Sequence, residues 1–341
     1  MNDYNLFYKK GLCGLTNLGN TCFMNSIIQC LSSNTEFIKL FLTNNYKEDL
    51  NTRIPDYKLL EQWILLVRGL YNKNAIVTPT SFHRCIQHLS IEKGNHTFSG
   101  FTQNDSQEFL QFLIEALHNS MSKKVIMNIT GTPTSEIDKM AVDAYTSWKL
   151  YFKNDYSKII EMFYGQFISN IETLEDISFH SKTYDPFSNI SLEIPILNKK
   201  INIYDCLDLF TTKEPLDEFK QHKEDMRKYT KNIRLWSTPT YLIIFFKRFN
   251  KKGLKKIDLI DFPITGLNLN KYVAGYDQDN NIFDLYAISN HSGDLHGGHY
   301  WAYTKNYDNQ WYKFNDSHVT LKDPNELITD SAYCLFYKKI N

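Results

Sequence analysis

The sequence has no net charge and no long hydrophobic run. Its 341 residues carry 38 Lys and Arg against 38 Asp and Glu, so the formal charge at pH 7 is zero. A chain without a basic stripe is not expected to bind nucleic acid or an anionic membrane surface. The longest apolar run, Tyr241–Phe246, has six residues, whereas a membrane helix needs about 20. We therefore expect a soluble protein that recognises its partners through local patches.

The first residues do not have the pattern expected of a secretion signal, and the cysteines do not have that of a disulfide framework. Its first residues, MNDYNLFYKK, contain no apolar stretch between a basic segment and small residues. Cysteines stand only at positions 13, 22, 30, 85, 206 and 334, without a repeated spacing. This pattern favours free thiols in a reducing compartment. We expect an intracellular location, in the cytoplasm, the nucleus or both, where one thiol can be reactive.

The first half of the chain has helical periodicity. Between residues 21 and 31 the apolar positions fall on one helical face, and they are Phe23, Ile27, Ile28 and Leu31. Asn20 or Thr21 is the expected N-cap of this helix. Further helices are expected at about 56–71, 79–90, 105–120 and 137–153, with a surface loop at 121–136.

The second half is predicted to be mainly strands. From about residue 162 the sequence contains short aromatic and β-branched segments, among them FYGQFISNIETL, ISLEIPI, TYLIIFFKRF, LYAISNHS, HYWAYTKN, QWYKFND and YCLFYKK. Helices followed by strands, with no βαβ alternation, indicate an α+β fold with a mostly antiparallel sheet. A cleft between the two halves is the natural place for a site.

Cys22 lies at the expected start of the first of these helices. A thiol is a good nucleophile only as thiolate, and a helix N-terminus favours negative charge. The preceding segment GLTNLGN contains Gly14 and Gly19 and predicts a tight loop that leads into the helix. The alternative is a small cysteine buried in the core, which is the commoner use of a free Cys.

Asn17 precedes Cys22 by five residues in the same loop. Acyl transfer produces an oxyanion that needs hydrogen-bond donors, and the Asn17 side-chain amide is a candidate donor. The alternative is that Asn17 only forms an Asx-turn, as Asn often does in loops that contain Gly.

His299 follows Gly297 and Gly298 and opens an aromatic strand in NHSGDLHGGHYWAY. It is the candidate general base. Three histidines within nine residues, His291, His296 and His299, also suggest a metal site. However, zinc sites usually add a carboxylate or thiolate at a fixed spacing, and neither HExxH nor CxxC occurs in the sequence.

A general-base histidine needs an acceptor on its second ring nitrogen, and WYKFNDS offers Asn315 and Asp316 one short turn downstream. The expected hairpin brings either residue close to His299. On its own, an Asn-Asp pair more often forms a turn.

Taken together, these segments resemble the ubiquitin-specific proteases. GLTNLGNTCFMNSIIQCL is similar to the cysteine box of that family, and HSGDLHGGHYWAYTKN with WYKFNDSHV is similar to its histidine box. Other segments resemble the family in the same order: QNDSQEFLQFLIEAL, FYGQF, YLIIFFKRF and DFPITGL. The resemblance runs from Gly11 to Tyr337. It implies a papain-like core described as thumb, palm and fingers.

The resemblance also implies a domain layout and catalytic roles. Residues 1–10 would be a short extension and 11–341 one catalytic domain, with the thumb at about 11–160, the fingers at 161–240 and the palm at 241–341. By motif position, Cys22 would be the nucleophile, His299 the base, Asn17 an oxyanion donor and Asn315 the residue that orients His299. Asp316 would assist beside them, and since Asn315 is neutral its contribution is expected to be larger than usual.

Substrate contacts follow from the same resemblance. It implies that Gln103, Asp105 and His291 lie near the extended C-terminal tail of ubiquitin, and that Gly297 and Gly298 allow its close approach. The alternatives are that Asp105 only caps its helix and that His291 only borders a loop.

The sequence departs from the family pattern in the expected fingers. Many members bind a structural zinc there through two CxxC pairs, and this sequence has neither pair. The stretches SNIETLEDISF and QHKEDMRKYTK occupy the corresponding regions, with Cys206 between them. We predict no bound metal, more flexible fingers, and an altered grip on ubiquitin.

The leading hypothesis is hydrolysis of the bond after the C-terminal glycine of ubiquitin by a monomer that needs no cofactor. One alternative is a protease for a ubiquitin-like modifier, because the altered fingers would hold the globular part of the substrate. Another is a non-catalytic ubiquitin-binding scaffold. A scaffold predicts damaged catalytic positions, and the sequence shows none.

Overall fold

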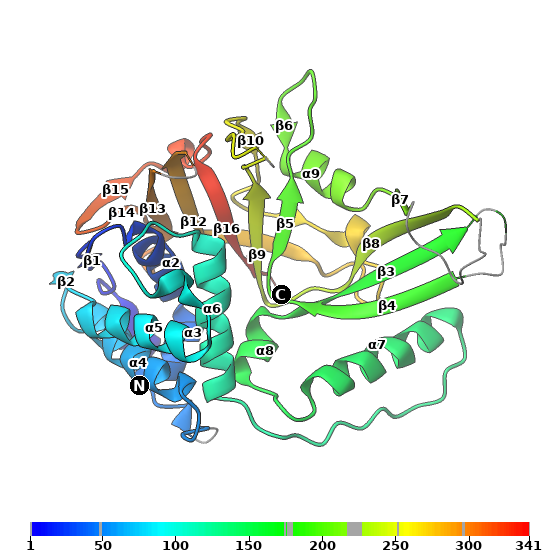
Figure 1. The fold of residues 1–341 in the computed structure, drawn as a ribbon, viewed down its shortest axis with the longest axis horizontal. Helices are drawn as coiled ribbons and strands as arrows, with labels where there is room; N and C mark the ends of the chain where they lie inside the picture. Colours follow the sequence, from blue (N-terminus) through cyan, green and yellow to red (C-terminus); the bar gives the residue numbers. More distant parts are fainter. Residues whose placement is uncertain are drawn as a thin grey trace.

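The helical half forms one side of the molecule. The computed structural model describes residues 2–47, 50–173, 175, 180–216, 227–250, 252–294 and 297–340. Its helices in this half are α1 (Asp3–Phe7), α2 (Cys22–Ser32), α3 (Thr35–Leu42), α4 (Asp56–Asn72), α5 (Thr80–Glu92) and α6 (Ser106–Ser120). They cluster at the left of Figure 1, drawn in blue to cyan. Within the described ranges no helix is long and apolar enough to cross a membrane.

A large sheet packs against these helices. Its strands follow the order β15-β14-β13-β12-β16-β9-β5, and β11 pairs with β12. All the pairings are antiparallel except that of β5 with β9. The strands are β5 (Ile190–Glu193), β9 (Tyr241–Lys247), β11 (Leu267–Asn268), β12 (Ile282–Gly293), β13 (Gly298–Lys305), β14 (Trp311–Asn315), β15 (His318–Lys322) and β16 (Ala332–Lys339).

The most apolar stretch of the sequence is the strand β9, which is buried on both faces. Side chains of a strand alternate between its two faces. Tyr241, Ile243 and Phe245 belong to the core shared with the helices. The intervening residues belong to a second core on the other side of the sheet, and they are Leu242, Ile244 and Phe246. Burial on both faces explains the unbroken apolar run without a membrane.

A four-stranded sheet extends to the right in Figure 1, with α7 running along one side of it. Its order is β4-β3-β8-β7. The elements are α7 (Glu136–Phe152), α8 (Lys158–Phe163), β3 (Gly165–Thr173), β4 (His180–Phe187), β7 (Glu214–Leu216) and β8 (Tyr229–Ser237). Short elements complete the chain: β1 (Gly14–Leu15), β2 (Ile76–Val77), β6 (Ile201–Asn202), α9 (Ile203–Phe210) and β10 (Ile260–Asp261).

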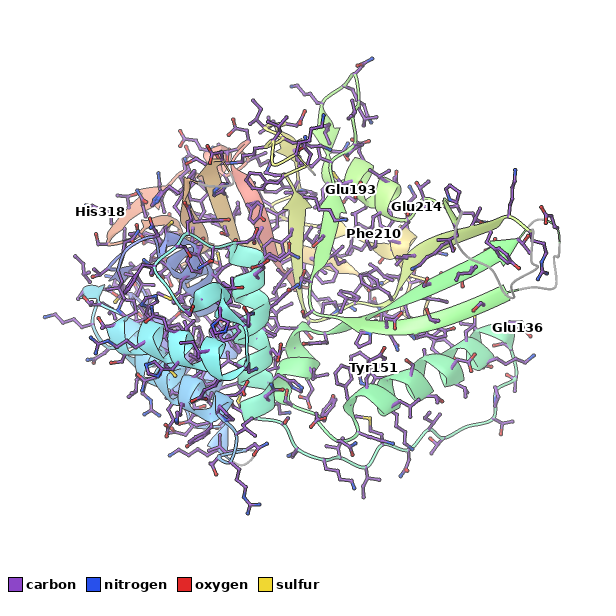
Figure 2. The ribbon with its side chains drawn as sticks, viewed as in Figure 1. Glu136, Tyr151, Glu193, Phe210, Glu214 and His318 are labelled. Carbon is purple, nitrogen blue, oxygen red and sulfur yellow. The ribbon has the colours of Figure 1, made fainter. Side chains whose placement is uncertain are left out.

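The helix α7 packs on the four-stranded sheet through a small apolar cluster. Ala141 and Ala144 of α7 contact a set of sheet residues made up of Ile168, Tyr184 and Trp236. Tyr151, labelled in Figure 2, donates from its hydroxyl to Asp185 Oδ1 at 3.1 Å. Gln166 Nε2 donates to the carbonyl of Ala144 at 3.0 Å. This helix therefore braces the sheet through contacts that need no metal.

The sequence predicted the longer helices and many of the longer strands, but not the short elements, among them α1, α8 and α9. The helices expected at 56–71, 79–90, 105–120 and 137–153 correspond to α4, α5, α6 and α7, and residues 121–135 contain no helix. The helix α3 and the strands β4, β8 and β15 were not predicted. The structure describes only part of SNIETLEDISF and QHKEDMRKYTK, the two stretches where the family's CxxC pairs were expected. Residues 174, 176–179 and 217–226 lie outside the described residues. Cys206 is buried in α9, where desolvation raises the pKa of its thiol to about 12.

Candidate active site

Cys22 is the first residue of α2 and is 3% exposed. Thr21 occupies the N-cap position, as predicted, but its side chain makes no capping hydrogen bond to the helix. Its Oγ1 instead accepts from Leu18 N at 2.9 Å. The first N–H groups of a helix have no partner inside it. Here they are left without a capping side chain, beside the thiol, where they favour negative charge.

The loop before Cys22 is organised by Asn17. Its Oδ1 accepts from Gly19 N at 3.0 Å and from Thr21 N at 3.1 Å, which is the turn that the sequence offered as one alternative. Its Nδ2 points the other way and donates to Asp316 Oδ2 at 3.0 Å. The turn and the directed amide therefore coexist, because the oxygen makes the turn and thereby fixes where the nitrogen lies.

His299, near the start of β13, joins the helix α2 to the sheet. It forms hydrogen bonds with Cys22 and, through Nε2, with Asn315 Oδ1 at 2.5 Å. The hydrogen bond with Cys22 is the main cause that raises the pKa of His299 to about 9, against the lowering effect of burial. Asn315 and the charge of Asp316 raise the His299 pKa further. Asn315 thus forms the expected hydrogen bond with a ring nitrogen of His299.

Asp316 lies at the turn between β14 and β15 with a φ of 50°. Its backbone oxygen accepts from Leu15 N at 2.8 Å. Its carboxylate accepts from Asn17 through Oδ2 and from Asn25 through Oδ1, the latter at 2.8 Å. The close approach requires Gly14, because a Cβ there would lie 2.2 Å from the carbonyl oxygen of Ser317. Asp316 thus contacts the Asn17 amide and influences His299 through its charge.

Gln103 and Gly298 are clamped together by two hydrogen bonds. Gln103 Nε2 donates to the carbonyl of Gly298 at 2.6 Å, and Gly298 N donates to Gln103 Oε1 at 2.9 Å. A Cβ on Gly298 would lie 2.3 Å from His291 Nε2, whereas one on Gly297 would meet nothing closer than 3.9 Å. The requirement for glycine at 298 therefore comes from internal packing, a reason that the sequence did not reveal.

Asp105 is the N-cap of α6, as predicted. Its Oδ1 accepts from Gln107 N at 2.5 Å, and its Oδ2 accepts from the Tyr333 hydroxyl at 2.6 Å. A pocket of about 60 Å³ brings together three of the predicted substrate residues, Gln103, Asp105 and His291. These residues come from segments almost 200 positions apart in the sequence, so the fold assembles them beside the start of β13.

His291 belongs to β12, two residues before its end, and only 2% of it is exposed. Its ring packs among the rings of Phe249, Tyr300 and Tyr333. Burial is the main cause that lowers its pKa to about 4, so the ring is neutral at pH 7. His291 therefore contributes a neutral and largely buried ring to the lining of the pocket.

The three-histidine alternative finds no support in the described residues. His296 lies outside them. Among the remaining described side chains, no group of three His, Cys, Asp or Glu is placed to hold a metal ion.

Asn25 contacts Asp316, and this contact was not predicted from the sequence. Asn25 lies one turn after Cys22 on α2 and is 3% exposed. The available signal was a polar residue between the apolar positions Phe23 and Ile27, inside a helix that is buried along its whole length. That signal could indicate a buried amide, but local periodicity does not identify its partner.

The comparisons with known proteins point to one family. The family model described as Ubiquitin carboxyl-terminal hydrolase matches residues 13–337. Ubiquitin carboxyl-terminal hydrolase 2 of Homo sapiens is 33% identical over 345 residues, covering 96% of this chain and 55% of that protein. Ubiquitin carboxyl-terminal hydrolase Usp2 of Drosophila melanogaster is 32% identical over 339 residues, covering 97% of this chain and 35% of that protein. The chain thus spans between about a third and just over half of these relatives' length.

The fold agrees with this match. A chain of the SAGA DUB module Ubp8/Sgf11/Sus1/Sgf73 bound to monoubiquitin superposes with a TM-score of 0.73 at 28% identity, over 98% of this chain and 70% of that chain. The expected α+β fold of the ubiquitin-specific proteases, with its papain-like core, is confirmed. Since the match runs from residue 13 to residue 337 and the fold agrees with it, this chain belongs to the ubiquitin carboxyl-terminal hydrolase family.

Proposed function

We propose that this chain is a deubiquitinating thiol hydrolase that cleaves the isopeptide or peptide bond after the C-terminal glycine of ubiquitin. The observation that carries the proposal is the hydrogen-bonded series Cys22, His299 and Asn315 at the start of α2. The curated relatives are named as ubiquitin carboxyl-terminal hydrolases, and the solved neighbour is bound to monoubiquitin. Those names and titles support the choice of substrate.

In the reactive form His299 already holds the proton of Cys22, so a protonated imidazole lies beside the thiolate. The thiolate attacks the carbonyl carbon of the substrate glycine, and His299 then donates the proton to the leaving amine. An acyl-enzyme remains on Cys22, and a water molecule activated by His299 hydrolyses it. Asn315 keeps the ring oriented by accepting from Nε2. Each step uses side chains of this chain, and no cofactor is invoked.

The oxyanion is stabilised by the Asn17 amide in this proposal. Asn17 Nδ2 carries two N–H groups, and Asp316 accepts from this nitrogen. The second N–H is then directed by the first and is available to the developing negative charge. Asp316 has two effects here, since its carboxylate fixes the donor and its charge stabilises the protonated form of His299.

The substrate tail is proposed to pass along the clamp between Gln103 and Gly298. These residues lie beside His299 and next to the pocket that includes Asp105. Gly297 is exposed and has open space around its Cα, which suits the approach of an extended peptide backbone. His291 belongs to the lining of the same pocket.

The experiment is turnover of ubiquitin that carries a fluorogenic amide at its C-terminus. Wild type is expected to release the fluorophore, and Cys22→Ala is expected to be inactive. Cys85→Ala is the matched control, because Cys85 is more exposed than Cys22 and burial raises the pKa of its thiol to about 11. This control should keep wild-type activity. Loss of turnover with Cys85→Ala and its retention with Cys22→Ala would refute the assignment.

A protease for a ubiquitin-like modifier is the second candidate. The sequence lacks both CxxC pairs, and α7 braces the four-stranded sheet. The expected fingers, which would hold the globular part of the substrate, therefore depart from the family pattern. Parallel assays with ubiquitin and its relatives separate the two substrates. We further propose that the chain acts as an intracellular monomer. Light scattering of the purified protein tests the monomer, and imaging of a tagged chain tests its location.

A further inference from the structure

Asn25 connects the nucleophile helix to the turn that carries Asp316. Its Nδ2 donates to Asp316 Oδ1 at 2.8 Å. The same nitrogen also faces the carbonyl oxygens of Leu15 and Thr16, at 3.5 and 3.4 Å. The Oδ1 of Asn25 is buried and has no hydrogen-bond partner. Three acceptors around one amide end settle its orientation, since a flipped amide would place oxygen against oxygen.

A buried amide oxygen without a partner lowers stability, because it loses its water and gains nothing in return. An aliphatic side chain at position 25 would avoid this cost, but it would remove the donor to Asp316. The orientation of Asn25 therefore keeps the hydrogen bond from Nδ2 to Asp316 and leaves Oδ1 without a partner. This is the pattern expected of a side chain that positions another group.

Asp316 relays this contact to the predicted oxyanion donor. Its two carboxylate oxygens are divided between two amides: Oδ1 accepts from Asn25, and Oδ2 accepts from Asn17. The backbone of Asp316 is held separately by Leu15 N. With the backbone and Oδ1 both fixed, Oδ2 is the oxygen left to direct Asn17. Two hydrogen bonds thus link three side chains in series: Asn25, Asp316 and Asn17.

We propose that Asn25 is a positioning residue that acts through Asp316 to hold the Asn17 amide in the orientation that stabilises the oxyanion. The proposal rests on the hydrolase function proposed above. It assigns to Asn25 no contact with the substrate or with Cys22. Its effect is therefore expected on the chemical step and not on ubiquitin binding.

The test is steady-state kinetics of Asn25→Ala with the fluorogenic ubiquitin amide. Loss of a single oxyanion donor costs about 10²- to 10³-fold in kcat. Loss of its alignment is expected to cost about 10- to 100-fold, with KM within about twofold of wild type. Asn25→Asp keeps the side-chain volume and places a second carboxyl against Asp316. It is expected to lose at least as much activity, and it is the variant to use if Asn25→Ala does not fold.

The matched control is Gln29→Ala. Gln29 lies one turn further along α2, is 4% exposed and donates from Nε2 to the carbonyl of Cys13 at 2.8 Å. It ties the same helix to the same N-terminal segment but has no contact with Asp316. Its loss is expected to lower the melting temperature and to leave kcat within about twofold of wild type. An equal fall in kcat for both variants would reduce Asn25 to a structural role and overturn the proposal.

A double-mutant cycle with Asn17→Ala gives the decisive reading. If Asn25 acts through Asn17, then Asn25→Ala should change kcat by less than about twofold in the Asn17→Ala background. Full multiplication of the two losses would overturn the proposal. Alkylation of Cys22 by a small haloacetamide, which forms no oxyanion, should keep its wild-type rate in Asn25→Ala. Failure of wild type to cleave ubiquitin would instead refute the proposed function, so the two failures are distinct.

Discussion

The candidate active site and the four-stranded sheet are each stabilised by a different kind of contact. The site depends on polar side chains from distant segments, such as Asn17 with Asp316 and Gln103 with Gly298. The sheet depends on strand pairing and on the apolar cluster that α7 forms with it. Polar contacts fix direction as well as distance, whereas apolar burial is non-directional. We therefore expect substitutions in the site to change chemistry and substitutions in the sheet to change stability and binding.

After the loss of the nucleophile in Cys22→Ala, the largest effect on activity is expected from Asp316→Ala. The substitution removes the acceptor that directs Asn17 and the charge that favours protonated His299. The value of kcat should fall by about 10²- to 10³-fold, as when an oxyanion donor is lost. Steady-state kinetics with fluorogenic ubiquitin measures this. A wild-type kcat would contradict the role of Asp316.

Asn315→Ala is expected to cost less, about 10- to 100-fold in kcat/KM, because it removes only the acceptor on His299 Nε2. The charge of Asp316 stays in place. The same assay measures the value. A loss larger than that of Asp316→Ala would reverse the order of the two residues, and wild-type rates for both would remove both roles.

The pH dependence follows from His299. Because the hydrogen bonds with Cys22 and Asn315 raise its pKa to about 9, His299 keeps its proton at neutral pH and loses it as the pH rises through about 9. The protonated ring must supply the leaving amine with a proton, so kcat/KM should fall above about pH 9. In Asn315→Ala one of the raising causes is lost, and this limb should move to lower pH. A shift to higher pH would contradict the hydrogen-bond assignment.

Two neighbouring glycines distinguish internal packing from substrate contact. Gly298→Ala places a Cβ against His291 and should displace the clamp with Gln103, lowering kcat/KM by about tenfold or more. Gly297→Ala has room in the free protein, so its fold should be unchanged. If the substrate tail passes along Gly297, the KM of Gly297→Ala should rise while the melting temperature of this variant stays at the wild-type value. An unchanged KM would move the tail away from Gly297.

Among the substitutions that compare the two regions, the smallest effect on chemistry is expected from Trp236→Ala in the four-stranded sheet. Trp236 is 4% exposed and packs against α7. Truncation of a buried aromatic side chain costs about 3–5 kcal/mol of stability. Under conditions where the variant remains folded, kcat should stay within about threefold of wild type. Denaturant unfolding and kinetics on the same preparation check this. A large fall in kcat of the folded variant would break the contrast between the two regions.

Local sequence patterns predicted the elements better than the contacts between them. Apolar periodicity identified α4, α5, α6 and α7, and the loop before Cys22 was recognised from its Gly and Asn residues. The short helix α3 was missed. Eight residues give only about two turns of periodicity.

Contacts between segments were predicted only where a short hairpin or the resemblance supplied them. The contact of His299 with Asn315 was expected. The hydrogen bonds that Asp316 accepts from Asn17 and from Asn25 were not, and they span 299 and 291 positions of the sequence, respectively. No local pattern encodes such a pairing. For the same reason, the sequence did not reveal that His291 is buried or that it excludes a side chain at Gly298.

The most direct test of the proposed function is labelling with ubiquitin that carries an electrophilic group at its C-terminus. Intact-protein mass spectrometry should show one ubiquitin added to the wild-type chain, and peptide mapping should place it on Cys22. The Cys22→Ala variant should remain unlabelled, and Cys85→Ala should label as wild type does. Labelling that persists in Cys22→Ala, or a wild-type chain that does not react, would contradict the assignment of Cys22 as the nucleophile of a ubiquitin hydrolase.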